Sequence, residues 1–132
     1  MKLYSLVKII DKKDLNLISQ NKIVGQHLIC DIKTDVCIIT IIEVQNDNTE
    51  RVLSRASDIY LGIDDFNSEF GSGAKTRFKS LVMKALQDAN IPEELRRVQC
   101  IILKGESSQI PIIKDIILLS IAEYTIRIQV AY

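Results

Sequence analysis

The sequence predicts an α/β fold in which a mixed β-sheet is flanked by helices. Three strand-like segments joined by short turns come first, and helical and strand-like segments then alternate along the chain. Strands with short connections pair antiparallel, whereas a strand reached through a helix can pair parallel. The length of 132 residues suits one hydrophobic core, so residues 1–132 are expected to form a single domain.

The first half of the chain is predicted to be mainly β-structure. Its expected strands are residues 3–10, 27–32, 36–44 and 50–56. The second and third are rich in β-branched residues, which favour strands. Turns are expected at 33–35 and 45–48, since Asn and Asp side chains favour tight turns. Residues 12–19 suit a short helix, and 21–25 a connector.

The second half begins with a change of period. Apolar residues recur at helical spacing, at Phe78, Leu81, Val82, Ala85, Leu86 and Ala89. Pro92 lies just past the end of this predicted helix. Residues 98–103 are expected to form a buried strand, and residues 124–130 a last strand. Between them, residues 110–121 should form a buried helix, capped by Ser107 or Ser108.

Composition narrows the classes of function. Lys and Arg number 17, as do Asp and Glu, so the net charge is zero. This balance argues against a nucleic-acid partner and against an anionic membrane surface, both of which attract basic proteins. No apolar run approaches the length of a membrane span, and no signal peptide is recognisable, so we expect a cytoplasmic protein.

The thiols and the histidine predict no metal centre. Cys30, Cys37 and Cys100 each lie in an apolar, strand-like run, which favours three buried, reduced thiols. The only histidine is His27, and no CxxC motif exists, so the spacing of a zinc site is missing. His27 alone does not support catalysis, and no serine or cysteine has a plausible base beside it in sequence.

A meander followed by alternating helices and strands is the ribonuclease-H-like plan, which actin-like ATPases, nucleases and sugar kinases share. Four stretches resemble the second lobe of the ATPase domain of DnaK-type, seventy-kilodalton heat-shock chaperones. Residues 6–13 (LVKIIDKK) resemble its Leu-Arg-Ile-Ile-Asn-Glu-Pro segment, and residues 28–36 (LICDIKTDV) its second phosphate motif, Asp-Leu-Gly-Gly-Gly-Thr-Phe-Asp-Val. Residues 58–67 (DIYLGIDDFN) resemble its Leu-Gly-Gly-Glu-Asp-Phe-Asp segment, and residues 103–111 (LKGESSQIP) its adenosine motif, Val-Gly-Gly-Ser-Thr-Arg-Ile-Pro.

This resemblance implies an actin-like ATPase fold with a vestigial nucleotide site. The residues expected there are Asp31, Thr34, Gly62, Gly105 and Ser107. The glycines that let backbone amides close on phosphates are missing from the turn after Asp31. Lys12 replaces the family's Glu, Glu106 replaces a glycine, and Gln109 replaces the Arg that stacks on adenine. We therefore expect no catalytic residue, no metal site, no cofactor, and neither tight ATP binding nor hydrolysis.

Two functions follow from the resemblance. The first is a non-enzymatic, chaperone-related pseudo-ATPase module for protein interaction or scaffolding. The second is a trimmed nucleotide-binding lobe of a working chaperone, which would bind ATP or ADP with magnesium weakly. The family's inserted subdomain is missing at a join near residues 67–76, where Gly71, Ser72 and Gly73 have the composition of a flexible linker. Its first lobe is missing too, which favours a protein partner or a homo-oligomer.

The same fold also suggests a nuclease. Asp31, Asp35, Asp64 and Asp65 would then be a carboxylate cluster for two-metal chemistry. In a simpler interpretation, Asp64 and Asp65 cap the segment that follows them, and Asp31 and Asp35 flank a hairpin turn. The neutral net charge favours this second interpretation.

Overall fold

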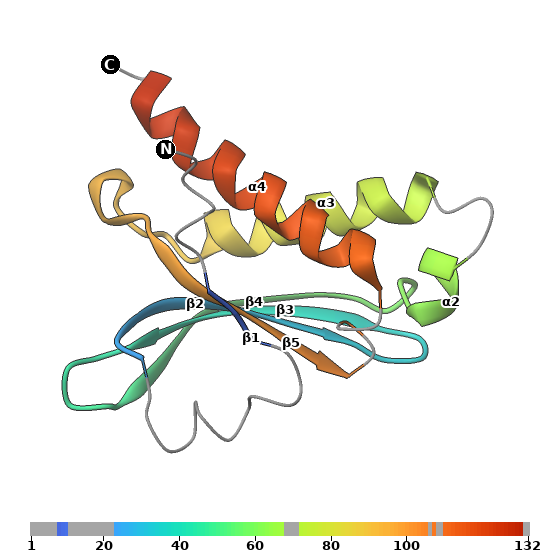
Figure 1. Cartoon of the computed structure of the whole chain (residues 1–132), viewed down its shortest axis with the longest axis horizontal. Helices are drawn as coiled ribbons and strands as arrows, with labels where there is room; N and C mark the ends of the chain where they lie inside the picture. The colour runs from blue at the N-terminus through green and yellow to red at the C-terminus, as the bar shows by residue number, and fades with distance from the viewer. Residues whose placement is uncertain (1–7, 11–22, 68–71, 106, 108–109, 131–132) are drawn as a thin grey trace.

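The computed structural model describes residues 8–10, 23–67, 72–105, 107 and 110–130. They form a five-stranded mixed sheet with two long helices packed on one of its faces (Figure 1). The strands are β1 (Lys8–Ile10), β2 (Gly25–Ile32), β3 (Cys37–Val44), β4 (Glu50–Asp58) and β5 (Val98–Gly105), in the order β1-β5-β2-β3-β4. The helical elements are α2 (Ile63–Asn67), α3 (Ser72–Asp88), the 3₁₀ turn η3 (Glu93–Leu95) and α4 (Pro111–Val130). The predicted α/β class is confirmed.

The predicted meander is also confirmed. Strands β2 and β3 pair antiparallel from Gly25 opposite Val44 to Ile32 opposite Cys37. Strand β4 pairs antiparallel with β3, with a register shift between Ile41 and Ile42. These three strands are joined by the two predicted short turns. Short turns and β-branched composition were therefore enough to predict the antiparallel pairing.

Strand β5 completes the mixed sheet. The chain leaves the meander at β4, passes through α2 and α3, and returns so that β5 pairs parallel with β2. On its other side β5 pairs parallel with β1. The carboxyl ends of β2 and β5 therefore meet at one edge of the sheet, and this edge positions the candidate site.

The main core lies between the sheet and the helices. Alternate residues of β2 and β3 point toward the helices, because side chains on a strand alternate between its two faces. They are Leu28, Cys30, Ile32, Cys37, Ile39 and Ile41, and all are fully buried. The five predicted apolar positions of α3, from Phe78 to Leu86, pack against them, as does Ala89 directly after the helix. The three cysteines are buried and free, as predicted.

The predicted last strand at 124–130 is wrong, because those residues belong to α4. No Gly or Pro follows Pro111 within the helix, so nothing in the sequence stops it at residue 121. Tyr124 shows the packing that favours the longer helix. Its hydroxyl donates to the Leu86 carbonyl of α3 at 3.2 Å, and the Arg96 guanidinium lies 4.4 Å from its ring centroid.

Four further expectations need correction or fall outside the described residues. Ser72 and Gly73 are not linker residues, since they form the first turn of α3, while Gly71 lies outside the described residues. Both long helices cover the same face of the sheet, whereas helices on both faces were expected (Figure 1). The short helix predicted at 12–19 lies outside the described residues, as does most of the strand predicted at 3–10.

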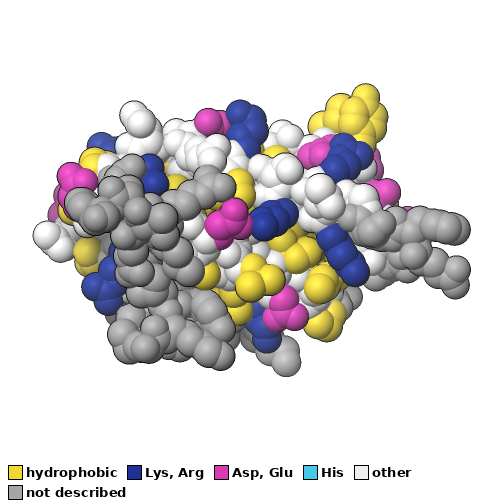
Figure 2. All heavy atoms as spheres, turned by 90° about the horizontal axis from the view of Figure 1, so that it is seen from above, with side chains coloured by type: hydrophobic (Ala, Val, Ile, Leu, Met, Phe, Trp, Pro, Cys, Tyr) yellow, Lys and Arg dark blue, Asp and Glu magenta, His cyan; other side chains and the backbone are white. Residues whose placement is uncertain are grey.

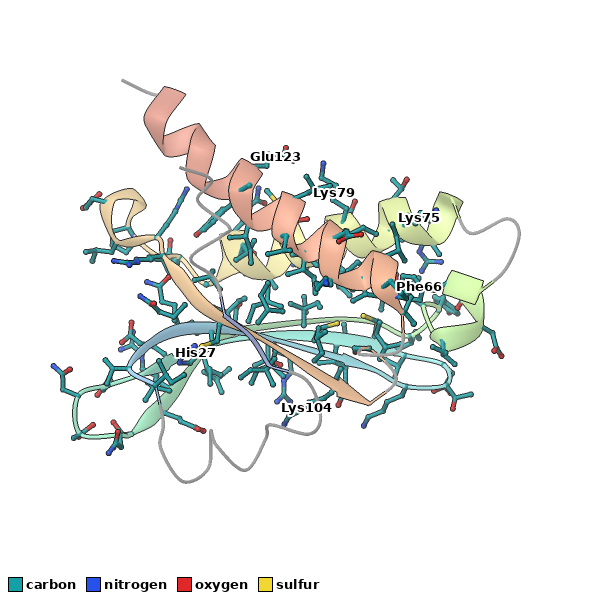
Figure 3. All side chains as sticks on the ribbon, viewed as in Figure 1. His27, Phe66, Lys75, Lys79, Lys104 and Glu123 are labelled. Carbon is teal, nitrogen blue, oxygen red and sulfur yellow. The ribbon has the colours of Figure 1, made fainter. Side chains whose placement is uncertain are left out.

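The outer surface of the helical layer carries mixed charge. Figure 2 looks down on this layer, and basic and acidic side chains are interspersed there with apolar ones. One ion pair joins the two long helices, with Lys79 of α3 2.8 Å from Glu123 of α4 (Figure 3). Within the described part of the chain, every helix is too short or too polar to cross a membrane.

Candidate functional site at the carboxyl ends of β2 and β5

The five residues predicted for the nucleotide site lie on four neighbouring segments. Asp31 is the penultimate residue of β2, and Thr34 lies in the turn between β2 and β3. Gly62 immediately precedes α2, and Gly105 ends β5. Ser107 follows two residues later, and its side chain is fully buried. Close contacts join Thr34 to Gly62, Asp31 to Gly105, and Ser107 to β2.

Gly62 packs directly on the backbone of the β2–β3 turn. A Cβ atom at Gly62 would lie 1.9 Å from the carbonyl oxygen of Thr34 and 2.7 Å from Cα of Asp35. The amide of Ile63 donates to the Lys33 carbonyl at 3.1 Å, which ties the start of α2 to the same turn. The missing side chain of Gly62 thus makes room for this chain's own backbone.

Asp65 caps the short helix α2. Its carboxylate accepts from the amide of Gly62 at 2.7 Å, three residues earlier, as the third residue of a capping box does. Phe66 then packs edge-to-face on Phe78 of α3, with ring centroids 5.5 Å apart. The capping role predicted for Asp65 is confirmed, and it leaves this carboxylate engaged in local structure.

Gly105 is the second glycine that the local backbone requires. Its φ of 60° lies in the left-handed region, which favours glycine. A Cβ atom there would lie 2.6 Å from the carbonyl oxygen of Ile32 and 2.8 Å from Oδ1 of Asp31. Here too the space next to the glycine is filled by β2.

Ser107 extends the pairing between β2 and β5. Its hydroxyl donates to the Cys30 carbonyl and accepts from the Ile32 amide, both at 3.1 Å. It thereby bonds two backbone groups near the carboxyl end of β2. The cap predicted for α4 at this residue is wrong, because the hydroxyl points to β2. The helix begins instead at Pro111, where the missing amide and fixed φ of proline are favourable. Ser108 lies outside the described residues.

A short chain of buried thiols continues from Ser107. The Cys30 thiol lies 3.5 Å from the serine hydroxyl. A hydrogen bond with Cys30, together with burial, raises the pKa of the Cys37 thiol well above its ordinary value. A thiol held protonated in this way is a poor nucleophile, which fits the place of Cys37 in the hydrophobic core.

The amides around the site point into the protein. The Lys33 amide donates to the Val36 carbonyl at 2.8 Å and closes the turn. The amides of Gly62 and Ile63 donate to Asp65 and to Lys33. A phosphate-binding loop needs several amides directed at the ligand. These three amides are satisfied by this chain's own oxygens.

The nuclease interpretation fails on geometry. In the described part of the chain, no three His, Cys, Asp or Glu side chains approach one another closely enough to hold a metal ion. Two of the four predicted carboxylates have separate local roles, since Asp31 lies next to Gly105 and Asp65 caps α2. The chain matches no protein-family model and no curated protein.

An open groove at the opposite end of β2 was not predicted from the sequence. It encloses about 680 Å³, a volume within the range of ligand sites. Its lining residues are Val24, Gly25, Gln26, Glu43, Val44, Gln45, Asn46, Asp47, Leu95, Arg97 and Gln99. They come from segments far apart in the sequence and share no motif. Gln26 lies between the predicted connector at 21–25 and the predicted strand at 27–32, and the structure places it in β2.

Gln26 fixes one wall of this groove. Its side-chain nitrogen donates to the Leu95 carbonyl at 2.7 Å, and its oxygen accepts from the Arg97 amide at 3.0 Å. The buried amide thus binds the connection between η3 and β5 in the way that a neighbouring strand would.

We expect Ser107→Ala to lower the free energy of unfolding by about 2 kcal/mol, because it leaves the Ile32 amide and the Cys30 carbonyl without their buried partner. Urea denaturation measures this loss. Ser120→Ala is the matched control. That hydroxyl is also fully buried, but it only donates to the Ile116 carbonyl of its own helix at 2.7 Å. Equal losses in the two variants would contradict the bridging role of Ser107.

Proposed function

We propose that this chain is a non-catalytic, chaperone-related pseudo-ATPase module that serves as a protein-interaction or scaffold domain. We further propose that its sheet is of the ribonuclease-H-like, actin-like ATPase type. The observation that carries the proposal is the close packing of Gly62 on Thr34. Two further contacts of this kind support it, since Gly105 lies against Ile32 and Asp31 of β2 in the same way.

The energetic consequence is large. A backbone hydrogen bond to a charged phosphate contributes about 1.5–3 kcal/mol. Losing two or three of them costs about 3–9 kcal/mol, which lowers affinity by about two to six orders of magnitude. The amides of Lys33, Gly62 and Ile63 are all engaged internally, so a nucleotide would first have to break those bonds.

An exposed apolar tip next to this site supports the interaction role. Ile59 and Tyr60 are 66% and 72% exposed at the end of β4. Their turn is held by Asp58, whose carboxylate accepts from the Tyr60 amide at 2.9 Å and from Arg77 of α3 at 2.6 Å. A rigid turn that presents an aromatic and an aliphatic side chain is preorganised for contact with another protein.

The convergence of Asp31, Thr34, Gly62, Gly105 and Ser107 favours one other candidate function. The chain would then be a trimmed lobe of a working chaperone ATPase, proposed to regain nucleotide binding when the missing parts are joined to it. The internal bonds of the amides count against this alternative, since an added lobe does not release them.

Calorimetric titration with magnesium-ATP separates the two candidates. The pseudo-ATPase proposal predicts no saturable heat up to millimolar nucleotide, because the phosphate-directed amides are lacking. Micromolar affinity in this chain would overturn the proposal and favour the trimmed lobe.

A further inference from the structure

His27 lies at the end of the sheet far from the converged glycines, as its distance from Phe66 in Figure 3 indicates. It is the only histidine in the sequence and is 2% exposed. Its Nε2 lies 2.5 Å from the Ile23 carbonyl oxygen, so Nε2 carries the proton and donates. Its Nδ1 is buried with no hydrogen-bond partner among the described residues.

The surroundings of His27 oppose a positive charge. Its cross-strand neighbours are Ile42 on β3 and Cys100 on β5. Among the described residues, the charged group that acts on it is Glu50 at the start of β4. Burial lowers the pKa of the imidazole below its ordinary 6.5, and the Ile23 carbonyl and Glu50 only partly offset this.

This histidine anchors one wall of the groove. Val24 and Gly25 line that wall, and they lie between the Ile23 carbonyl and His27 itself. Gly25 has a φ of 128°, and a Cβ atom there would meet the Gln99 side chain at 2.6 Å. The wall therefore stays in place through the His27–Ile23 bond and the fit of Gly25 against Gln99.

We propose that His27 is an acid-sensitive latch. The neutral side chain holds the Val24–Gly25 wall of the groove in place, in the closed form of this segment, and the protonated side chain releases it. Protonation leaves the Nε2 bond to Ile23 intact. It adds a proton at Nδ1, where no acceptor lies among the described residues, and places a full charge on a buried side chain. Exposing the ring to water relieves both costs, and this requires the start of β2 to move.

The size of the effect follows from linkage. In the open form, His27 is exposed to water and has its ordinary pKa near 6.5. In the closed form, burial lowers the pKa of His27 below that value. Between those two values the open form binds more protons, so opening becomes more favourable as the pH falls. The opening equilibrium then rises by up to about tenfold for each pH unit below 6.5.

Hydrogen exchange of the full chain tests the latch, with rates corrected for the intrinsic effect of pH. We expect the protection of the Val24 and Gly25 amides to fall by up to about tenfold per pH unit from pH 6.5 to 5, while the paired amides of β3 change much less. His27→Gln is the control, because its amide nitrogen can still donate to Ile23 but does not titrate. That variant should show no such pH dependence. An equal dependence in His27→Gln, or none in the native chain, would overturn the proposal.

A second measurement needs no variant. As the sequence has one histidine, a single ring-proton NMR resonance reports its titration directly. The latch requires a midpoint below 6.5, accompanied by shifts of the Val24 and Gly25 amides over the same pH range. A midpoint at or above 6.5, or a titration that leaves those amides unmoved, would also overturn it.

Discussion

Replacing Gly62 with alanine is expected to lower the free energy of unfolding by about 3 kcal/mol or more. The added Cβ would lie 1.9 Å from the Thr34 carbonyl oxygen and 2.5 Å from its carbonyl carbon. Both are backbone atoms of a closed turn, so no side chain can rotate away and the turn itself must shift. Urea denaturation monitored by circular dichroism measures the loss.

Gly73→Ala is the matched control. No atom lies within 4 Å of the position that its Cβ would take, and Gly73 is in the first turn of α3. Alanine is there expected to leave stability unchanged or to raise it by up to about 1 kcal/mol. A Gly62→Ala protein as stable as Gly73→Ala would mean that Gly62 does not pack on the turn as described.

Phe78→Ala is expected to cost about 3–5 kcal/mol, because a fully buried ring leaves a cavity at the centre of the core. The ring also makes the edge-to-face contact with Phe66, which attaches α2 to α3. The destabilisation should therefore extend to α2 at the candidate site. We expect faster hydrogen exchange at the Ile63 amide as well as a lower midpoint of unfolding.

Two variants control this prediction. Phe78→Leu keeps most of the buried apolar volume and should cost clearly less than alanine. Leu119→Ala removes a side chain of α4 that is 63% exposed, and its effect should stay within about 0.5 kcal/mol. A loss below about 1 kcal/mol for Phe78→Ala would show that α3 does not form the core through this residue.

Periodicity predicted most of the fold. The stripe from Phe78 to Ala89 repeats at helical spacing, and the core of α3 follows it. Residues 124–130 misled because their alternation also fits a strand, and short apolar segments do not distinguish the two periods. The contact between Tyr124 and Leu86 favours the helix. This contact depends on packing between segments far apart in sequence, which periodicity does not report.

That Asp31, Thr34, Gly62, Gly105 and Ser107 form a vestigial nucleotide site stays a prediction. The resemblance selected Gly62, Gly105 and Ser107, and the structure brings them to the edge where β2 and β5 end. The resemblance could not predict what those residues contact. The contacts of Gly62 with Thr34 and of Ser107 with Ile32 depend on how segments far apart in sequence pack together. The groove follows from no sequence motif, because its lining residues come from segments far apart in the sequence.

The most direct test is an NMR titration of the isotope-labelled chain with magnesium-ATP, followed at the amides of Lys33, Gly62, Ile63 and Gly105. If the chain's own oxygens satisfy the first three amides, all four should keep their chemical shifts up to millimolar nucleotide. The Ile63 amide, bonded to the Lys33 carbonyl at 3.1 Å, should stay protected from hydrogen exchange throughout. Saturable shifts at these amides at micromolar nucleotide would contradict the account, because they would show that the site opens and binds phosphate.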